Sequence, residues 1–344
     1  MIGHNVKTQN KQRHIVKKLF SGAVAALLIS VTAQADYSSN PGAEAFIKTM
    51  VEKHNFDRDW VLAILKQAEP KQSILDAMSR PAESVMTWGR YRNIFIQDSR
   101  VTQGVEFWKE HREELARAEK EYGVPASMIV GIIGVETRFG RNMGSYRVVD
   151  ALATLGFDFP RRSTFFLGQL EEYMLMAREQ GIEPFSLKGS YAGAMGYGQF
   201  IPSSYRAYAV DFDGDGKIDI VNSTVDAIGS VANYFKRHGW RYGEPVVSSA
   251  ILKQGADQSL FNADLKPVKT LAELSKAGIG SDRVLEPTQK ATAMKLEGEK
   301  GDEYWIGLQN FYVITRYNHS AMYAMAAYQL SQLIEAGMRE APGS

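Results

Sequence analysis

A chain of 344 residues is long enough for a sizeable hydrophobic core and for two or three domains. Its hydrophobic content of 44% and charged content of 23% are those of a globular protein, which excludes a disordered or fibrous chain. The formal net charge is only +1, so the strongly basic balance expected of a nucleic-acid-binding protein is missing. With no cysteine the chain can form no disulfide bond. Its stability must come from the burial of apolar side chains, either alone or together with a bound ion.

The N-terminal segment has the pattern of an export signal. Basic residues between positions 11 and 18 precede the apolar run 19–31, and Ala33-Gln34-Ala35 supplies the small residues of a cleavage site. The apolar run is shorter than the roughly 20 residues of a membrane span. We predict a signal peptide over residues 1–35, cleaved before Asp36, and a soluble mature protein. An uncleaved N-terminal anchor is the alternative.

Apolar residues at helical spacing cover the segment 43–78, where we predict several short helices because Pro70 and Pro81 interrupt the pattern. The following segment, 85–95, is dense in aromatic residues and arginines. We interpret it as a loop that packs on the core or as a wall of a sugar-binding groove. These segments define a predicted N-terminal helical domain over residues 36–103.

A single acid, Glu136, lies on the most apolar helix of the chain. We expect a helix over residues 104–122 and then a largely buried helix that ends near Gly140. Burial and the negative end of the helix dipole both disfavour a charged carboxylate, so we predict a raised pKa for Glu136. A carboxylic acid that is still protonated near neutral pH can act as a general acid. The alternative is a structural ion pair with Arg138 or Arg141.

The segment 150–180 continues at helical spacing. Arg161 and Arg162 stand at its helix start, where the dipole prefers anions, so they either face an anionic group such as a peptide carboxylate or form a solvated pair. The glycine-rich run 189–199 follows. Its glycines allow close approach of the backbone to a ligand in a saccharide cleft, or simply a tight packing turn.

The segment 211–226 has the spacing of an EF-hand calcium loop. Carboxylates stand at the first, third and fifth positions, a glycine stands at the sixth, and the seventh offers a backbone carbonyl. Asn222 occupies the twelfth position, where such loops carry a bidentate Glu. Neighbouring carboxylates repel each other without a cation, so we predict a structural calcium ion, with a solvated acidic turn as the alternative. The predicted ligands are Asp211, Asp213, Asp215, Lys217 and Asp226.

In the C-terminal third, the helical spacing of apolar residues gives way to strand-forming segments. After a predicted helix over 225–238, the segments 246–252, 291–296 and 304–316 are rich in strand-forming residues, with turn signals at Gly298 and Gly301. A short helix near 271–276 should cover part of the resulting antiparallel sheet, and residues 318–338 return to helical spacing.

Together these patterns predict a mainly α (α+β) fold. The expected divisions after the N-terminal helical domain are a core over 104–241, a small β domain over 242–314, and a C-terminal helix over 315–344 that returns to the helical part.

Three long motifs, 131–141, 189–202 and 225–240, resemble those of the lytic murein transglycosylase B family, and the resemblance extends from about Phe46 to Leu333. It implies a lysozyme-like catalytic core within a larger helical domain, a small antiparallel β domain and one EF-hand-like calcium site. The chain departs from the family pattern in its calcium loop, which is one residue longer before Asp226.

Matched residue by residue, the resemblance implies that Glu136 is the catalytic acid. The residues that it implies for substrate binding are Tyr91, Arg161, Arg162, Ser190, Gln199, Phe200, Tyr234, Tyr317, Asn318 and Tyr323. The two arginines are implied to face the peptide stems.

The resemblance also implies the reaction. The β-1,4 bond between N-acetylmuramic acid and N-acetylglucosamine would break without water, with Glu136 as acid and then base, and would leave 1,6-anhydromuramic ends. No cofactor is expected for catalysis. The expected setting is a periplasmic monomer that binds peptidoglycan, does not bind nucleic acid and associates with cell-wall synthesis proteins. A hydrolytic muramidase and a non-catalytic, calcium-stabilised peptidoglycan-binding protein are the alternatives.

Overall fold

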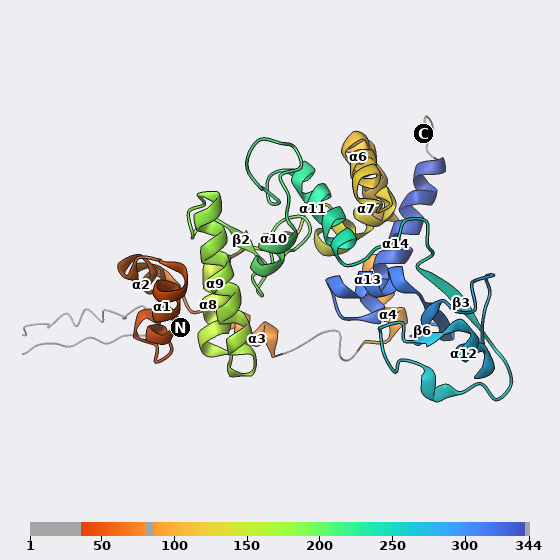
Figure 1. Cartoon of the computed structure of the whole chain (residues 1–344). Coiled ribbons are helices and arrows are strands. Elements are labelled where there is room, and N and C mark those ends of the chain that lie inside the picture. Colours follow the sequence, from red (N-terminus) through yellow and green to blue (C-terminus); the bar gives the residue numbers. More distant parts are fainter. Residues whose placement is uncertain (1–35, 80–85, 341–344) are drawn as a thin grey trace, which may run out of the picture. The chain divides into compact units, whose positions relative to one another are not determined.

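The computed structural model describes residues 36–79 and 86–340 (Figure 1). The predicted signal peptide and Pro81 lie outside these ranges. Within them, no helix is long and apolar enough to cross a membrane.

The N-terminal part is built from short helices, as predicted. A 3-10 helix, η1 (Tyr37–Ser39), is followed by α1 (Ala43–His54), α2 (Arg58–Gln67) and α3 (Gln72–Met78). The side chain of Asp57 accepts a hydrogen bond from the backbone N–H of Trp60 at 2.8 Å and so caps α2.

The aromatic segment before residue 96 is a helix, α4 (Trp88–Phe95), and the predicted loop is therefore wrong. Trp88, Tyr91 and Phe95 recur at helical spacing, and the first two are buried. Helical periodicity here outweighs the preference of aromatic residues for strands and loops.

Two helices, α5 (Asp98–Glu110) and α6 (Arg112–Tyr122), replace the single helix predicted over 104–122. The break falls at His111, whose backbone has φ −114° and ψ 33°. Its ring packs on Phe107, with the ring centroids 4.6 Å apart.

The buried helix α7 (Ala126–Thr137) packs against the long C-terminal helix α14 (Ala321–Glu340). Glycines make this close approach possible: a Cβ atom on Gly131 would lie 2.8 Å from the Cβ atom of Ser331. The helix ends at Thr137, three residues before the predicted stop at Gly140, because Arg138 already takes the left-handed conformation with φ 51°.

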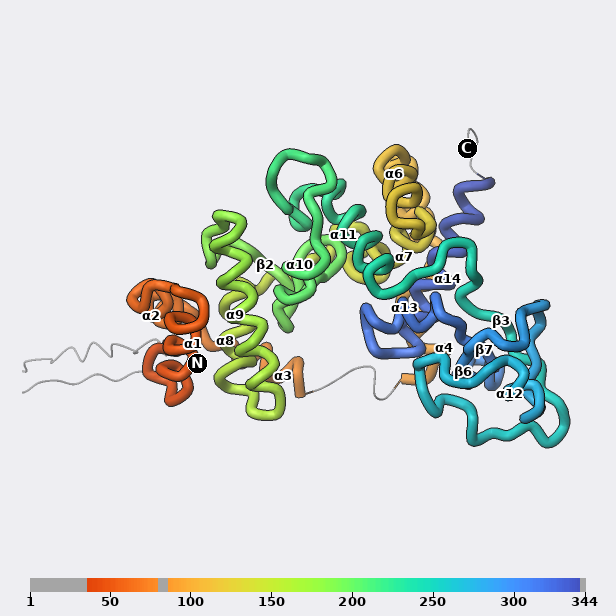
Figure 2. The backbone as a smooth tube through the Cα atoms, in the orientation of Figure 1, coloured from red at the N-terminus to blue at the C-terminus, as the bar shows by residue number. Residues whose placement is uncertain are grey.

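The middle of the chain adds further helices and two short strands. The elements are β1 (Tyr146–Arg147), α8 (Val148–Asp158), the 3-10 helix η3 (Pro160–Arg162), α9 (Ser163–Gln180), β2 (Lys188–Gly189), α10 (Pro202–Tyr208) and α11 (Thr224–Arg237). Helices α8 and α9 run side by side, and α11 contacts both α6 and α7 (Figure 2). Strands β1 and β2 form a short antiparallel pair at the start of the glycine-rich run.

The C-terminal third holds a five-stranded antiparallel sheet in the order β4-β6-β7-β3-β5. Its elements are β3 (Val247–Leu252), the 3-10 helix η4 (Gln258–Leu260), β4 (Lys269–Thr270), α12 (Leu271–Lys276), β5 (Ile279–Ser281), β6 (Lys290–Gly298) and β7 (Gly301–Gly307). The predicted turn between Gly298 and Gly301 is confirmed, and so is the short helix over 271–276.

The strand predicted over 304–316 is only half right. Strand β7 ends at Gly307, and α13 (Gln309–Tyr317) follows. Phe311, Val313 and Ile314 are fully buried in the core that the helices share, so packing overrides their intrinsic preference for strands. The mainly helical fold with a small antiparallel sheet is confirmed, whereas the predicted domain boundaries stay a prediction.

Candidate active site

A cavity of about 440 Å³ lies where the end of α7, the glycine-rich run, α10, α11 and the end of α13 meet. Seven of the residues predicted from the sequence line it: Glu136, Ser190, Gln199, Phe200, Tyr234, Tyr317 and Asn318. These residues come from segments up to 182 positions apart along the chain, and the fold brings them to one hollow.

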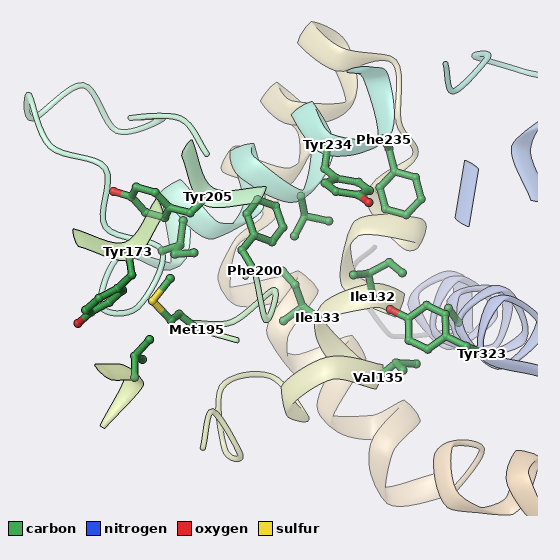
Figure 3. Close-up of a cluster of buried hydrophobic side chains, with 14 of the residues drawn as sticks. Ile132, Ile133, Val135, Tyr173, Met195, Phe200, Tyr205, Tyr234, Phe235 and Tyr323 are labelled. Atoms are coloured by element: carbon green, nitrogen blue, oxygen red, sulfur yellow. The ribbon is translucent and has the colours of Figure 1, made fainter. Parts of the chain in front are cut away.

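Glu136 is half-buried on the last turn of α7 and accepts a hydrogen bond on Oε1 from the phenol of Tyr323. Tyr323 is buried on α14, and Figure 3 shows its ring beside Ile132 and Val135 of α7. Burial, and after it the charge of Glu136, raises the pKa of Tyr323 well above 10. The phenol therefore keeps its proton, and the carboxylate is held by a donor from a second helix.

The backbone just after the acid is strained. Arg138 and Phe139 have φ values of 51° and 59°, a conformation that side chains other than glycine rarely adopt. The hydroxyl of Thr137 donates to the carbonyl of Tyr197 at 2.9 Å and accepts from the N–H of Gly140 at 3.0 Å. These bonds join the end of α7 to the glycine-rich run.

Arg138 turns away along a neighbouring helix. Its Nε donates to Gln103 at 2.8 Å and its Nη2 donates to Ser99 at 3.2 Å, both on α5. The guanidinium thus holds the strained turn against α5.

The glycine-rich run is a sequence of tight turns. The hydroxyl of Ser190 accepts from the N–H groups of Ala192 and Ala194, and the run closes on itself through paired backbone bonds between Met195 and Phe200. Gly193 has φ +78°, and a Cβ atom there would lie 2.5 Å from the side chain of Leu152. A side chain at this position would be strained and would also meet α8.

Gln199 anchors the same run to the loop after α7. Its Nε2 donates to the carbonyls of Met143 at 3.2 Å and Gly196 at 3.0 Å, and its backbone has φ 50°. Two backbone outliers of the described residues, Arg138 and Gln199, therefore flank the cavity, as is common where strain is kept for function.

Three aromatic residues form one wall of the cavity, which we call the aromatic wall: Phe200, Tyr234 and Tyr317. The ring centroids of Tyr234 and Tyr317 are 4.7 Å apart and those of Phe200 and Tyr234 are 5.7 Å apart. Figure 3 shows Phe200 and Tyr234 as neighbours. The phenol of Tyr317 donates to the carbonyl of Gly198 at 2.6 Å, and that of Tyr234 donates to the carbonyl of Arg316 at 2.5 Å. Burial raises the pKa of both phenols, so both stay protonated as donors.

The acidic loop gathers three carboxylates. Oxygens of Asp211, Asp213 and Asp226 lie within 4.8 Å of one another. Asp226, at the start of α11, is buried and accepts from the N–H groups of Phe212, Asp213 and Asp219. Three oxygen donors at this separation suit a hard cation such as Ca²⁺. Asp215 is outside this group and accepts instead from the N–H of Lys217 at 2.8 Å.

The family profile of the transglycosylase SLT domain matches residues 38–332. The chain belongs to this family. It is 49% identical over 308 residues to the membrane-bound lytic murein transglycosylase B of Escherichia coli (strain K12), an alignment that covers 87% of this chain and 84% of the relative. This family member is thus an enzyme of the lytic murein transglycosylase class, a lyase that acts on polysaccharide.

Solved structures of relatives have the same fold. The transglycosylase is similar to soluble lytic transglycosylase SltB1 from Pseudomonas aeruginosa, with a TM-score of 0.83, 56% identity, and coverage of 88% of this chain and 100% of that one. It is also similar to the Escherichia coli lytic transglycosylase Slt35 in complex with calcium, with a TM-score of 0.81, 48% identity, and coverage of 89% and 96%. These likenesses confirm the predicted fold class, including the lysozyme-like core.

Four residues predicted to bind substrate do not line the cavity. Tyr323 lies behind Glu136, as described. Tyr91 is buried with its ring 5.1 Å from that of Phe95. Arg161 and Arg162 are exposed in η3, and the guanidinium of Arg162 lies 4.3 Å from the ring centre of Phe165. Their roles in substrate binding stay predictions.

Six lining residues were not predicted, and two of them, Tyr191 and Arg316, carry an aromatic ring or a charge. Tyr191 is 43% exposed at the cavity, and Arg316 adds the one cation of its lining. The position of Tyr191, an aromatic residue inside the glycine-rich run, could have indicated that it lines the cavity. Arg316 offered no such signal, because residues 304–316 were read as a strand.

Proposed function

We propose that this transglycosylase cleaves the β-1,4 bond between N-acetylmuramic acid and N-acetylglucosamine without water and leaves 1,6-anhydromuramic ends. The observation that carries the proposal is that Glu136 is the one carboxylate among the residues that line the cavity. Relatives with solved structures support the substrate class, because one is in complex with a NAG-NAM-pentapeptide and another with bulgecin A.

Glu136 acts twice. Protonated, it gives its proton to the glycosidic oxygen, and the bond from that oxygen to C1 of muramic acid breaks as an oxocarbenium-like state develops. The carbonyl of the substrate's own N-acetyl group stabilises that state. The carboxylate then takes the proton of the C6 hydroxyl, and O6 bonds to C1. The acid is regenerated, and no water is consumed.

The neighbours of Glu136 orient it and the sugar. The phenol of Tyr323 holds Oε1, so the other carboxylate oxygen is the one that exchanges the proton. The exposed ring of Tyr191 offers a face on which a sugar ring stacks, and the aromatic wall, in which Phe200 and Tyr234 are buried, closes the cavity on one side. Arg316 supplies a positive charge to the carboxylates of the peptide stem.

A hydrolase with two carboxylates would need a second acid about 5 to 10 Å from the first. The cavity lining offers none, which supports intramolecular capture by O6.

Calcium is proposed as a structural ion. A relative's structure is a complex with calcium, and Asp211, Asp213 and Asp226 fit such an ion by donor type and spacing. The ion would supply charge neutralisation to the loop and take no part in proton transfer. The further ligands Asp215 and the carbonyl of Lys217 stay predictions. The proposed setting is the periplasm, where murein lies.

The test of the proposal is Glu136→Gln, with Glu106→Gln on the exposed face of α5 as the matched control. Loss of one general acid lowers the release of soluble muropeptides from murein sacculi by about 10²- to 10⁴-fold. Binding to sacculi in a pelleting assay should persist in both variants. Undiminished release by Glu136→Gln would sink the assignment.

A further inference from the structure

A histidine stands directly behind the aromatic wall. His238 follows the last residue of α11, and its ring lies 4.0 Å from that of Tyr234 at an interplanar angle of 25°, a stacked arrangement. The ring of Tyr208 on α10 packs on it from another side at 4.8 Å. The contact between His238 and Tyr234 is the closest ring contact of the aromatic wall among the described residues. The contacts of Phe200 and Tyr317 have ring centroids 4.7 Å or more apart.

The hydrogen bond of His238 defines its tautomer. Nδ1 lies 2.7 Å from the backbone carbonyl of Tyr234. A carbonyl can only accept, so Nδ1 carries the proton and Nε2 is the nitrogen that can gain one. The histidine therefore holds both the backbone and the ring of the residue with which it stacks.

The surroundings of His238 disfavour a positive charge. The charged and titratable groups around it are Arg237 on its own helix, Arg316 on α13, and the phenols of Tyr208 and Tyr234. Burial lowers the pKa of His238 below 6.5, and the charges of Arg316 and Arg237 act in the same direction, whereas the bond to Tyr234 opposes them.

We propose that His238 is a positioning residue, which fixes Tyr234 and through it the carbonyl of Arg316, and that it does so only as a neutral imidazole. Tyr234 and Arg316 both line the cavity, and the phenol of Tyr234 bonds to the Arg316 carbonyl at 2.5 Å. Protonation at Nε2 adds a positive charge that burial and the charges of Arg316 and Arg237 disfavour, and it disturbs the stack on Tyr234. The inference rests on the proposed function only in that it takes the cavity to be the substrate site.

The test compares three variants over pH 5 to 8, with bulgecin A as the probe ligand, since a relative's structure holds it. His238→Phe keeps a ring for stacking but cannot be protonated, and His238→Ala removes the ring. His111→Phe is the matched control, because His111 also packs on an aromatic ring, that of Phe107, away from the cavity.

In the unaltered protein the affinity for bulgecin A falls as the pH drops below the pKa of His238, by up to about tenfold per pH unit. His238→Phe removes this fall and keeps the affinity at pH 8 within about threefold. His238→Ala weakens binding by about 3- to 10-fold at every pH, which is the worth of one aromatic pair. A fall that persists unchanged in His238→Phe, or full affinity in His238→Ala, overturns the proposal. A change of affinity with pH that comes from titration of bulgecin A itself appears equally in the control variant His111→Phe.

A second readout does not depend on ligand binding. NMR signals of the Tyr234 ring, assigned with Tyr234→Phe, should shift with the same midpoint as the ring signals of His238. Absence of this coupling overturns the positioning role whatever the activity. Coupling without any binding of bulgecin A leaves the positioning role standing and contradicts the proposed substrate cavity instead.

Discussion

Tyr323 is the side chain through which α14 reaches the acid on α7. Its phenol is buried, keeps its proton, and donates to Glu136 Oε1. Because the donor comes from a different helix, the carboxylate is held by the packing of two long elements rather than by its own rotamer alone. We therefore expect Tyr323 to affect turnover more than substrate affinity.

Tyr323→Phe should therefore lower turnover while binding changes little. A hydrogen bond to a charged group is worth about 1.5–3 kcal/mol, which corresponds to a fall of about 10- to 150-fold. Muropeptide release and sacculus pelleting, measured together, check this. Tyr328→Phe, five residues further along α14, is the control, and an equal loss in both variants would point to a general effect on the helix.

At the scale of elements, the contact between α7 and α14 sets where Glu136 and Tyr323 meet. A Cβ atom on Gly131 would lie 2.8 Å from Ser331 Cβ and 3.0 Å from the backbone carbonyl of Ala327. The backbone atom cannot rotate away, so any side chain must push the two helices apart.

Gly131→Ala should destabilise the fold by about 1–3 kcal/mol through this overpacking. Gly168→Ala is its counterpart within α9: nothing lies within 4 Å of the added Cβ, so the same substitution should stabilise by about 0.5–1 kcal/mol. Denaturant unfolding of both variants measures the two changes. Equal effects of the same sign would show that helix propensity, not close packing, explains Gly131.

Several helices could be predicted from the sequence alone. Periodicity predicted α7, α11 and α12 because apolar spacing and glycine turns are local signals. It failed at α13, where Phe311 and Val313 favour a strand but the shared core makes the segment a helix. The same error hid the position of Arg316 at the cavity, because that position depends on the segment being a helix. The bond from Tyr323 to Glu136 joins positions 187 apart, and only the resemblance to a family, not a local pattern, had linked them.

In the whole molecule, a backbone hydrogen bond joins the acidic loop to the glycine-rich run beside the cavity. The N–H of Tyr197 in the glycine-rich run donates to the carbonyl of Ile220 at 3.1 Å, six residues before Asp226. Asp226 in turn accepts from three backbone N–H groups of the loop. An ion held by these aspartates would stabilise the segment on which the run rests.

Calcium should therefore raise the melting temperature of the chain. At 100 times its dissociation constant the ion adds about 2.7 kcal/mol, and a protein of this size gains about 1–2 °C per kcal/mol. Asp213→Asn should lose the increment in a thermal-shift titration, whereas Asp264→Asn, an exposed acid outside the loop, should keep it. A full calcium response in Asp213→Asn would contradict the ligand group.

We propose that one carboxylate, Glu136, serves as acid and then as base and that no water enters the product. Mass analysis of the muropeptides released from sacculi tests it most directly, because an anhydro product is lighter than its hydrolysed counterpart by one water molecule. We expect anhydro products from the unaltered enzyme, and essentially neither anhydro nor hydrolysed products from Glu136→Gln. Products with a reducing, hydrated muramic end would contradict it and would identify a hydrolase.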